Sequence, residues 1–336
     1  MHFLTGYPGP VHLALPVDIM FSSFAENVGL QERSFDRTAQ PLPRAWSDPD
    51  ALAPVLEAIN NAERPVVIAG HGELDYNHGS DMPLLSDPGA FLDAMGDLDK
   101  TWDAWFDLQV QRRTEWVKEW SAHLEEETAK DQAEGRKMHP LQLGVDVQAE
   151  INDSDWLVFV GGNTHFWNEI ATNIAAKRGL KLGGILHPGN YSLQGVGVSF
   201  GLSAKNVHPD KTVVVISGDG AFLSGGLSVE ACFRENPPIV VVIDNNGGLD
   251  CISRLQEKLF GNGQHYATDF RDIPFHTLFE GMGGYGEMVT KREELSGAIQ
   301  RAIASRKAAC VNVKCRGVIS PIVAATAGKR DKASIE

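Results

Sequence analysis

The sequence predicts an α/β chain in which a parallel sheet carries helices on both faces. From about residue 138 onward, short apolar runs alternate regularly with stretches of helical spacing. This alternation is typical of successive βαβ units, whose strands are parallel. Several of the apolar runs end in glycine, as buried strands often do where the chain turns into a helix.

The predicted elements are less regular before residue 138 than after it. In the first part we expect a strand over residues 9–19 and a linker over 31–50. A helix over 50–62, a strand over 64–70 and a helical region over 91–134 are expected to follow. In the second part we expect strands over residues 156–162, 181–186, 212–217, 238–244 and 310–314. Between them, helices are expected over residues 166–178 and 224–235, and a glycine-rich turn followed by a helix over residues 189–204. The tryptophans of the helical region are expected to pack in an amphipathic helix rather than to bind a ligand.

Composition narrows the class of protein. The 336 residues suggest about two domains, and the net charge of −14 argues against a nucleic-acid surface or an anionic lipid surface. No apolar run approaches the roughly 20 residues that span a bilayer, and the first residues do not resemble a signal peptide. We therefore expect a cytoplasmic protein whose four scattered cysteines are reduced thiols. Cys310 and Cys315 lie five residues apart in a strand-like run, so they should point to opposite faces.

Residues 212–248 contain the sequence pattern that indicates a ligand-binding site. An apolar strand ends at Gly218-Asp219-Gly220, and a helix is expected just after it. The two glycines allow a sharp turn and a close approach of backbone N–H groups to a ligand. The amino end of the helix would face the same place and favour a negative charge. The next strand ends in Asn245-Asn246, at the same edge of the sheet.

The spacing of Asp219 and Asn246 predicts a cation site. They are 27 residues apart in the sequence, which is one βαβ step in space. A carboxylate and an amide oxygen suit Mg²⁺, with phosphate oxygens and water completing its coordination. Each motif alone is a common turn sequence, but both together, at the ends of strands that bracket one helix, are much more specific.

These residues resemble the diphosphate and magnesium motif of thiamine diphosphate (ThDP) enzymes. The resemblance is to the acetolactate synthase group, which includes oxalyl-CoA decarboxylase and the 2-hydroxyacyl-CoA lyases. It implies that Asp219, Asn246 and the main-chain carbonyl of Gly248 bind Mg²⁺. It also implies that the turn at Gly218 binds the diphosphate, with N–H groups offered by Gly220 and Ala221.

The resemblance extends to a domain organisation. It implies the last strand of a pyrimidine-binding domain plus a linker in residues 1–30, and a truncated middle domain with connecting helices in 31–137. Residues 138–336 would form the ThDP diphosphate- and Mg²⁺-binding domain with a C-terminal tail. The family's pyrimidine-binding domain carries a glutamate that promotes formation of the C2 ylide. We therefore expect a homo-oligomer or a separate pyrimidine-domain chain to supply that residue, and we assign no FAD or ADP contacts.

Further site residues follow from the resemblance. Gly195 and the helix after it are expected to pack under the thiazolium ring. The family places an apolar residue before this glycine; here Gln194 occupies that position, as a variation tied to the substrate, or Leu193 serves instead. Glu287 is expected either to face the substrate hydroxyl or to be a surface carboxylate after a glycine-rich turn. Residues 190–192 would touch the cofactor or substrate, or form an ordinary helix-initiating turn.

Two functions are consistent with these residues. The resemblance implies a ThDP- and Mg²⁺-dependent C–C lyase, decarboxylase or carboligase that acts through a C2 ylide. Its substrate would be a 2-oxo acid or a 2-hydroxyacyl-CoA, and its activity would need a pyrimidine-domain partner. The alternative is a non-catalytic truncated remnant or a ThDP-binding module.

Overall fold

The computed structural model describes most of the chain, namely residues 49–65, 88–96, 98, 100–189, 192–235, 237–261 and 263–327. The chain divides into two compact units, residues 1–111 and 112–336. Several predictions fall outside the described residues: the strand in 9–19, most of the strand in 64–70, and Asn190 and Tyr191.

The first unit contains a small helical cluster. Helix α2 (Pro49–Asn61) confirms the helix predicted over residues 50–62. It packs against α3 (Pro88–Met95). The region predicted as helical over 91–134 is interrupted, because α3 ends at Met95 and α4 (Asp103–Glu134) begins eight residues later. Trp102 lies in this interval, packs against the α2–α3 cluster and donates a hydrogen bond from Nε1 to the Ala62 carbonyl, 2.9 Å away.

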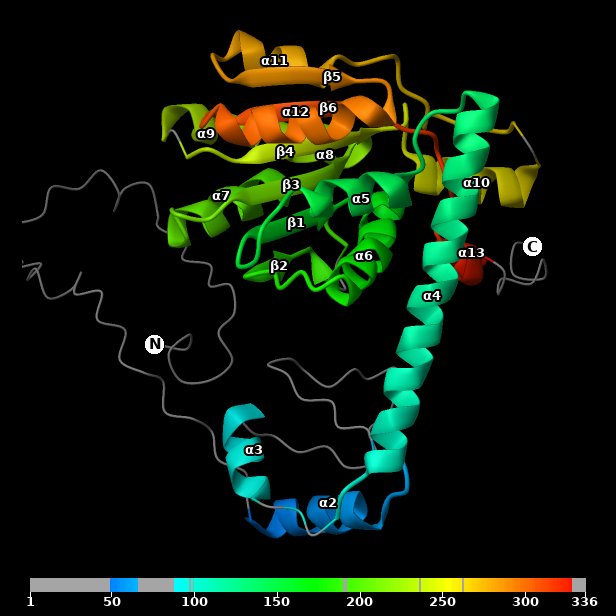
Figure 1. Ribbon diagram of the computed structural model, residues 1–336, viewed down its shortest axis with the longest axis vertical. Helices are drawn as coiled ribbons and strands as arrows, with labels where there is room; N and C mark the ends of the chain where they lie inside the picture. Colours follow the sequence, from blue (N-terminus) through cyan, green and yellow to red (C-terminus); the bar gives the residue numbers. More distant parts are fainter. Residues whose placement is uncertain are drawn as a thin grey trace, which may run out of the picture. The chain divides into compact units, whose positions relative to one another are not determined.

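The second unit is built on a six-stranded sheet, in which every neighbouring pair is parallel (Figure 1). Its strands are β1 (Trp156–Val160), β2 (Gly184–Leu186), β3 (Val213–Gly218), β4 (Val240–Asn245), β5 (Tyr285–Val289) and β6 (Ala309–Lys314). Their spatial order is β2-β1-β3-β4-β6-β5. The predicted fold class is confirmed. The other five strands lie where the sequence pattern predicts them, whereas β5 was not predicted.

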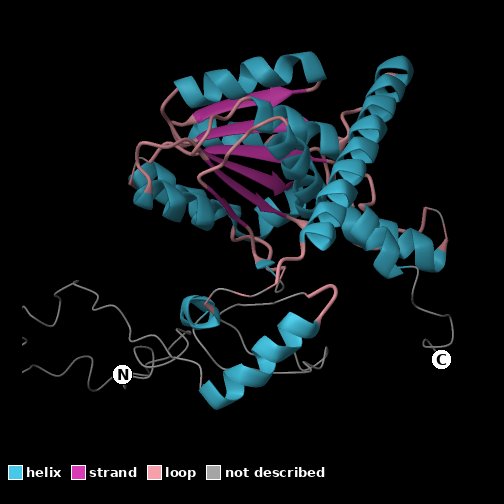
Figure 2. Ribbon diagram, turned by 60° about the horizontal axis from the view of Figure 1, so that its bottom comes forward, coloured by secondary structure: helices cyan, strands magenta, loops and turns pink. Residues whose placement is uncertain are grey.

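Helices cover both faces of this sheet (Figure 2). One face packs against α5 (Pro140–Ala149), α6 (Gly162–Lys177) and α12 (Arg292–Ala304). The other packs against α7 (Gly197–Val207), α8 (Asp219–Gly225), α9 (Glu230–Arg234) and α11 (Phe275–Gly281). Alternate residues of β3 enter opposite cores: Val214 and Ile216 on the α5 side, Val213 and Val215 on the α7 side. The period of two that defines a strand therefore supplies both cores.

Three remaining features complete the second unit. Residues 112–134 of α4 pack through Val117 and Leu124 against α5 and α6. Helices α10 (Asp250–Phe260) and α13 (Pro321–Ala327) pack against each other and against α6. Among the described residues, no helix combines the length and apolar character needed to cross a membrane.

The cysteines behave as expected. Cys310 belongs to the core on the α7 side and Cys315 to the core on the α5 side, so the prediction of opposite faces is confirmed. All four cysteines are free thiols.

The helix predicted over residues 224–235 differs most from the structure. Helix α8 begins at Asp219 itself and ends at Gly225. A 3₁₀ turn, η4 (Gly226–Val229), and the short helix α9 follow. The paired glycines explain the break, because glycine lowers helix stability and permits a change of backbone direction.

Candidate functional site

The site lies where the order of the sheet reverses. The chain runs from β1 to β2 on one side, then returns to β3 on the other side of β1. Open α/β sheets bind ligands outside the carboxyl ends of the strands at such a point. Gly161, directly after β1, has a φ of 121°, and a Cβ atom there would lie 3.1 Å from the Gly218 nitrogen. The turns after β1 and β3 are therefore in close contact at this edge.

A small cavity, partly open to solvent, occupies this edge. Seven of the residues predicted to bind cofactor or metal line it: Gln194, Gly218, Asp219, Gly220, Ala221, Asn246 and Gly248. Two other lining segments were not predicted from the sequence: residues 161–164 after β1 and residues 249–252 at the start of α10. The first has the same strand–glycine–helix pattern as the Gly218 turn, and that pattern was the available signal.

Asp219 connects the two predicted motifs. Its buried carboxylate accepts hydrogen bonds from the backbone N–H groups of Gly220 (2.7 Å), Gly247 (2.7 Å) and Gly248 (3.1 Å). Burial raises its pKa to about 6, although the three N–H groups act in the opposite direction. The strands that carry the two motifs, β3 and β4, are adjacent. Asp219 and the Asn246 turn therefore lie at the ends of neighbouring strands, as the sequence predicts.

The oxygen atoms at this turn fit a hard divalent cation. The side-chain Oδ1 of Asn246 is buried and has no hydrogen-bond partner within the described part of the chain. A buried acceptor without a donor is unfavourable, and a cation would satisfy it. Asp219 supplies a carboxylate beside it, and the same turn continues to the carbonyl of Gly248. The donor set, made of oxygens only, suits Mg²⁺.

The two candidate residues in the loop before α7 lie in different surroundings. Gln194 lines the cavity, whereas the side chain of Leu193 is 60% exposed and is not among the lining residues. Gly195 has a φ of 85°, and a Cβ atom on it would lie 3.0 Å from the Gly225 nitrogen at the end of α8. This contact holds the loop against α8 and leaves Gln194 at the cavity.

Glu287 lies away from the cavity. It belongs to β5, the outermost strand, where its register partner is Val311 in the middle of β6. Its carboxylate accepts hydrogen bonds from Tyr285 and Arg301, and the Arg301 guanidinium lowers its pKa. The structure therefore does not bring Glu287 together with Asp219. The carboxylate also lies within a strand rather than in the loop that its glycine-rich neighbours suggested.

Asp244 is a second buried carboxyl group that the sequence analysis missed. It lies near the end of β4, beside Asp219, and accepts a hydrogen bond from the Thr164 hydroxyl at 2.7 Å. Burial raises its pKa to about 7, and the charge of Asp219 adds to that increase. The available signal was an aspartate inside an otherwise apolar strand, directly before Asn245-Asn246.

Asn163 joins the cavity wall to the C-terminal segment. Its amide nitrogen donates to Asp250 Oδ2 (2.8 Å), and its amide oxygen accepts from the Ser320 backbone nitrogen (2.9 Å). Arg254 donates to Asp250 Oδ1 (3.1 Å) and to the Gly317 carbonyl (3.3 Å). These bonds hold the start of α10, which lines the cavity, against α6 and the residues before α13.

A second depression lies between α5 and α12. Asp146, Glu150 and Arg292 line it, together with residues of α4 and α12. Arg292 forms an ion pair with Asp146 at 2.8 Å, so these charges already compensate each other. None of the residues that line this depression lies at the carboxyl end of a strand. The Asp219 and Asn246 motifs therefore belong to the first cavity only.

The fold is that of a doubly wound α/β protein, and its cavity lies at the switch point of the sheet, where both predicted motifs meet. Residues 170–313 match the family described as thiamine pyrophosphate enzyme, C-terminal TPP binding domain. The matched residues include 212–248, so the resemblance to the thiamine diphosphate enzymes that was drawn from this segment is confirmed.

Curated relatives agree with this family. The chain is 32% identical over 148 residues to a 2-hydroxyacyl-CoA lyase of Arabidopsis thaliana, a match covering 43% of this chain and 25% of the relative. It is 34% identical over 129 residues to a probable acetolactate synthase of Mycobacterium bovis (38% and 23%). It is 33% identical over 141 residues to an oxalyl-CoA decarboxylase of Escherichia coli K12 (42% and 24%). Each match thus spans about a quarter of the relative's length.

Proposed function

We propose that this chain binds ThDP and Mg²⁺ at the carboxyl edge of β3 and β4 and forms part of a C–C lyase, decarboxylase or carboligase. The observation that carries the proposal is the buried Oδ1 of Asn246, which lies close to the Asp219 carboxylate and has no hydrogen-bond partner among the residues that the structure describes. It lies within the region that matches the TPP-binding family. The names of the relatives support a 2-oxo acid or a 2-hydroxyacyl-CoA as the substrate.

Each residue of the edge has a proposed task. Asp219, Asn246 and the Gly248 carbonyl hold the cation, and the amino end of α8 at Gly220 and Ala221 faces the diphosphate. Gln194 provides a polar contact at the side of the cavity that faces the loop before α7. Bound ThDP supplies an electron sink for making or breaking a bond next to a carbonyl carbon. The protein contributes binding, orientation and the exclusion of water.

We further propose that a second polypeptide surface completes the cofactor site. Three large apolar side chains, in the loop before α7, in α8 and in η4, are exposed: Leu193 (60%), Leu223 (50%) and Leu227 (74%). Exposed apolar side chains of this size favour an interface. A second copy of the chain or a separate pyrimidine-domain chain would cover them. The four free thiols support a reducing, cytoplasmic setting.

Calorimetric titration of the chain with ThDP, with and without Mg²⁺, tests the cofactor site. We expect saturable binding that requires Mg²⁺ and that Asp219→Ala weakens by more than about 100-fold, because the substitution removes a direct cation ligand. Asp210→Ala is the matched control, since Asp210 is exposed in the loop before β3, at the opposite edge of the sheet. It should bind as the wild type does. A folded wild-type chain that binds no ThDP would contradict the proposal.

Activity is tested separately on the loaded chain. A 2-oxo acid and a 2-hydroxyacyl-CoA are each added, and release of the cleaved or decarboxylated product is followed. Product formation that Asp219→Ala abolishes supports the enzyme. Tight Mg²⁺-dependent ThDP binding without product from either substrate class, also when a pyrimidine-domain chain is added, would favour a ThDP-binding module.

A further inference from the structure

Asp244 lies directly behind the proposed cation site. It is paired in register with Gly218, the residue before Asp219, and its side chain is on the same face of β4 as Val240 and Val242. Only 1% of the residue is exposed. It is not among the residues that line the cavity, so it is placed behind the cation ligands rather than among them.

The contacts of Asp244 leave its charge uncompensated. Oδ2 accepts a hydrogen bond from the Thr164 hydroxyl (2.7 Å), and the uncharged Cys315 thiol lies close to the carboxyl group. Oδ1 is buried and has no hydrogen-bond partner, and no Lys, Arg or His forms an ion pair with Asp244, within the described residues. The neighbouring charges that act on it belong to two other carboxylates, Asp219 and Asp250.

A buried carboxylate with acidic neighbours is unfavourable unless something positive lies close by. Two positive sources are available at this edge. The first is the amino end of the 16-residue helix α6, where Thr164 lies in the first turn. The second is the divalent cation proposed at Asp219 and Asn246. The arrangement is therefore better suited to the cation-bound protein than to the metal-free one.

We propose that Asp244 is a positioning residue of the cation site: its carboxylate adds negative charge behind the ligands and, through Thr164, fixes the amino end of α6 at the cavity. This inference rests on the proposed function, because it requires a cation at Asp219 and Asn246. Groups behind the direct ligands commonly change metal affinity by 10- to 100-fold.

The test measures Mg²⁺ affinity and metal-free stability together. Mg²⁺ is titrated calorimetrically into the full chain saturated with ThDP, and the melting temperature is recorded without metal. Asp244→Asn should weaken Mg²⁺ binding by at least about tenfold. It should not lower the metal-free melting temperature, because the amide keeps an oxygen for Thr164 and removes a buried charge. Thr164→Val should also weaken Mg²⁺ binding, whereas Thr164→Ser should restore it.

Asp155→Asn is the matched control. Asp155 is likewise buried, but it lies before β1, at the opposite edge of the sheet, and accepts backbone N–H bonds from Asn152 and Thr212 (2.9 Å each). This variant makes the same change in net charge and should lower the melting temperature while leaving Mg²⁺ affinity unchanged.

The outcomes separate this inference from the proposed function. Normal Mg²⁺ and ThDP binding by the wild type, with Asp244→Asn within twofold of it, overturns the role of Asp244 alone. A lower melting temperature of Asp244→Asn with unchanged Mg²⁺ affinity shows a purely structural residue and also overturns it. A wild-type chain that binds neither Mg²⁺ nor ThDP removes the proposed function as well.

Discussion

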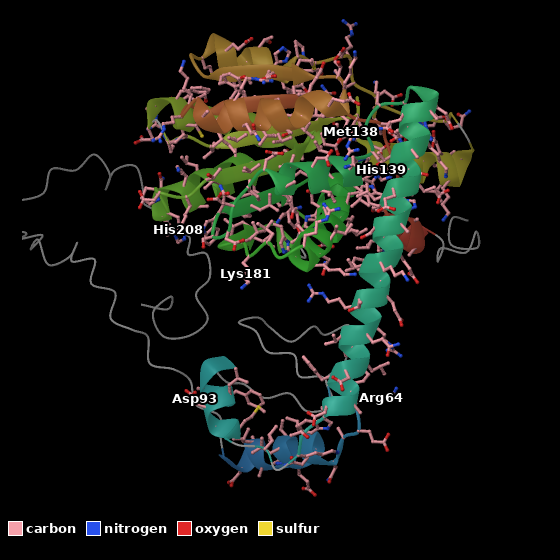
Figure 3. The ribbon with its side chains drawn as sticks, in the orientation of Figure 1. Arg64, Asp93, Met138, His139, Lys181 and His208 are labelled. Carbon is pink, nitrogen blue, oxygen red and sulfur yellow. The ribbon has the colours of Figure 1, made fainter. Side chains whose placement is uncertain are left out.

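His139 illustrates how one buried side chain controls the start of a helix. It lies at the amino end of α5 (Figure 3), and its Nδ1 atom accepts a hydrogen bond from the Leu141 backbone nitrogen at 3.0 Å. Its ring packs edge to face against Trp167, with the centroids 4.8 Å apart. Burial lowers the pKa of His139 to about 3, and the charge of Arg316 contributes to the decrease. The neutral ring is therefore the form that caps the helix.

We predict that His139 makes the fold sensitive to acid. Its folded pKa lies below the unfolded value of 6.5, so its contribution is complete at higher pH and is lost as the pH falls below 6.5. Between pH 7 and pH 5 the loss amounts to about 2 kcal/mol. His139→Asn keeps a capping oxygen but cannot titrate. The free energy of unfolding in urea should therefore fall less between pH 7 and pH 5 in His139→Asn than in the wild type, by about 2 kcal/mol. An equal fall in both proteins would contradict the role of His139.

At the scale of elements, a neighbouring segment holds the turn between β4 and α10 in place. The Leu249 nitrogen donates to the Thr268 carbonyl (2.8 Å), and the Phe270 nitrogen donates to the Gly247 carbonyl (2.7 Å). Gly248 lies between these bonds, and a Cβ atom on it would be 2.5 Å from the Thr268 carbonyl oxygen. Glycine is therefore required here because two backbones approach closely.

Gly248→Ala should move this turn away from Asp219. We expect a loss of about 1–3 kcal/mol in the free energy of unfolding, because the backbone of the adjoining segment must shift. Weaker Mg²⁺ binding should accompany it, since the Gly248 N–H also contacts Asp219. Denaturant unfolding and calorimetry measure the two effects. Gly281→Ala, at the end of α11, is the control because nothing lies within 4 Å of its Cβ position. Equal stability and equal Mg²⁺ affinity of the two variants would contradict the need for glycine at position 248.

For the molecule as a whole, the segment that follows Asp219 presents exposed apolar side chains. Leu227 in η4 and Leu223 in α8 are both largely exposed, close in sequence to the turn that carries Asp219. Water contact with such groups is unfavourable, and association would bury them. Helix α8, which begins at Asp219, would therefore also contribute to the contact between subunits through Leu223.

We predict that the chain self-associates and that Leu227→Asp weakens the association by at least about tenfold, as expected when a buried leucine is replaced by a charge. Sedimentation equilibrium of both proteins measures the effect. Val207→Asp is the control: Val207 is similarly exposed, 72%, but lies at the end of α7 that leads to the amino end of β3. A monomeric wild type, or equal dissociation constants for all three proteins, would count against this interface.

The elements that could be predicted from the sequence are those with a strong local pattern. The fully buried strands β3 and β4 are uninterrupted apolar runs, and α2 has clear helical spacing. Strand β5, Tyr285–Val289, was missed because it is an outer strand. It is only half-buried, and it contains a glycine and a glutamate that resemble a loop. Its pairing with β6 outweighs this weak local preference.

The sequence by itself determined the two motifs of the site, because each lies where a buried strand ends and local chemistry is enough to recognise it: Asp219 after β3 and Asn246 after β4. Only the tertiary structure decided what surrounds them. Thr164, Asp244 and Asp250 reach the site through contacts between residues up to 87 positions apart. The placement of Glu287 two strands away from β4 was decided in the same way. The physical reason is that local patterns define where strands and turns occur, whereas the order of strands in the sheet, set by long-range packing, decides which of their ends meet.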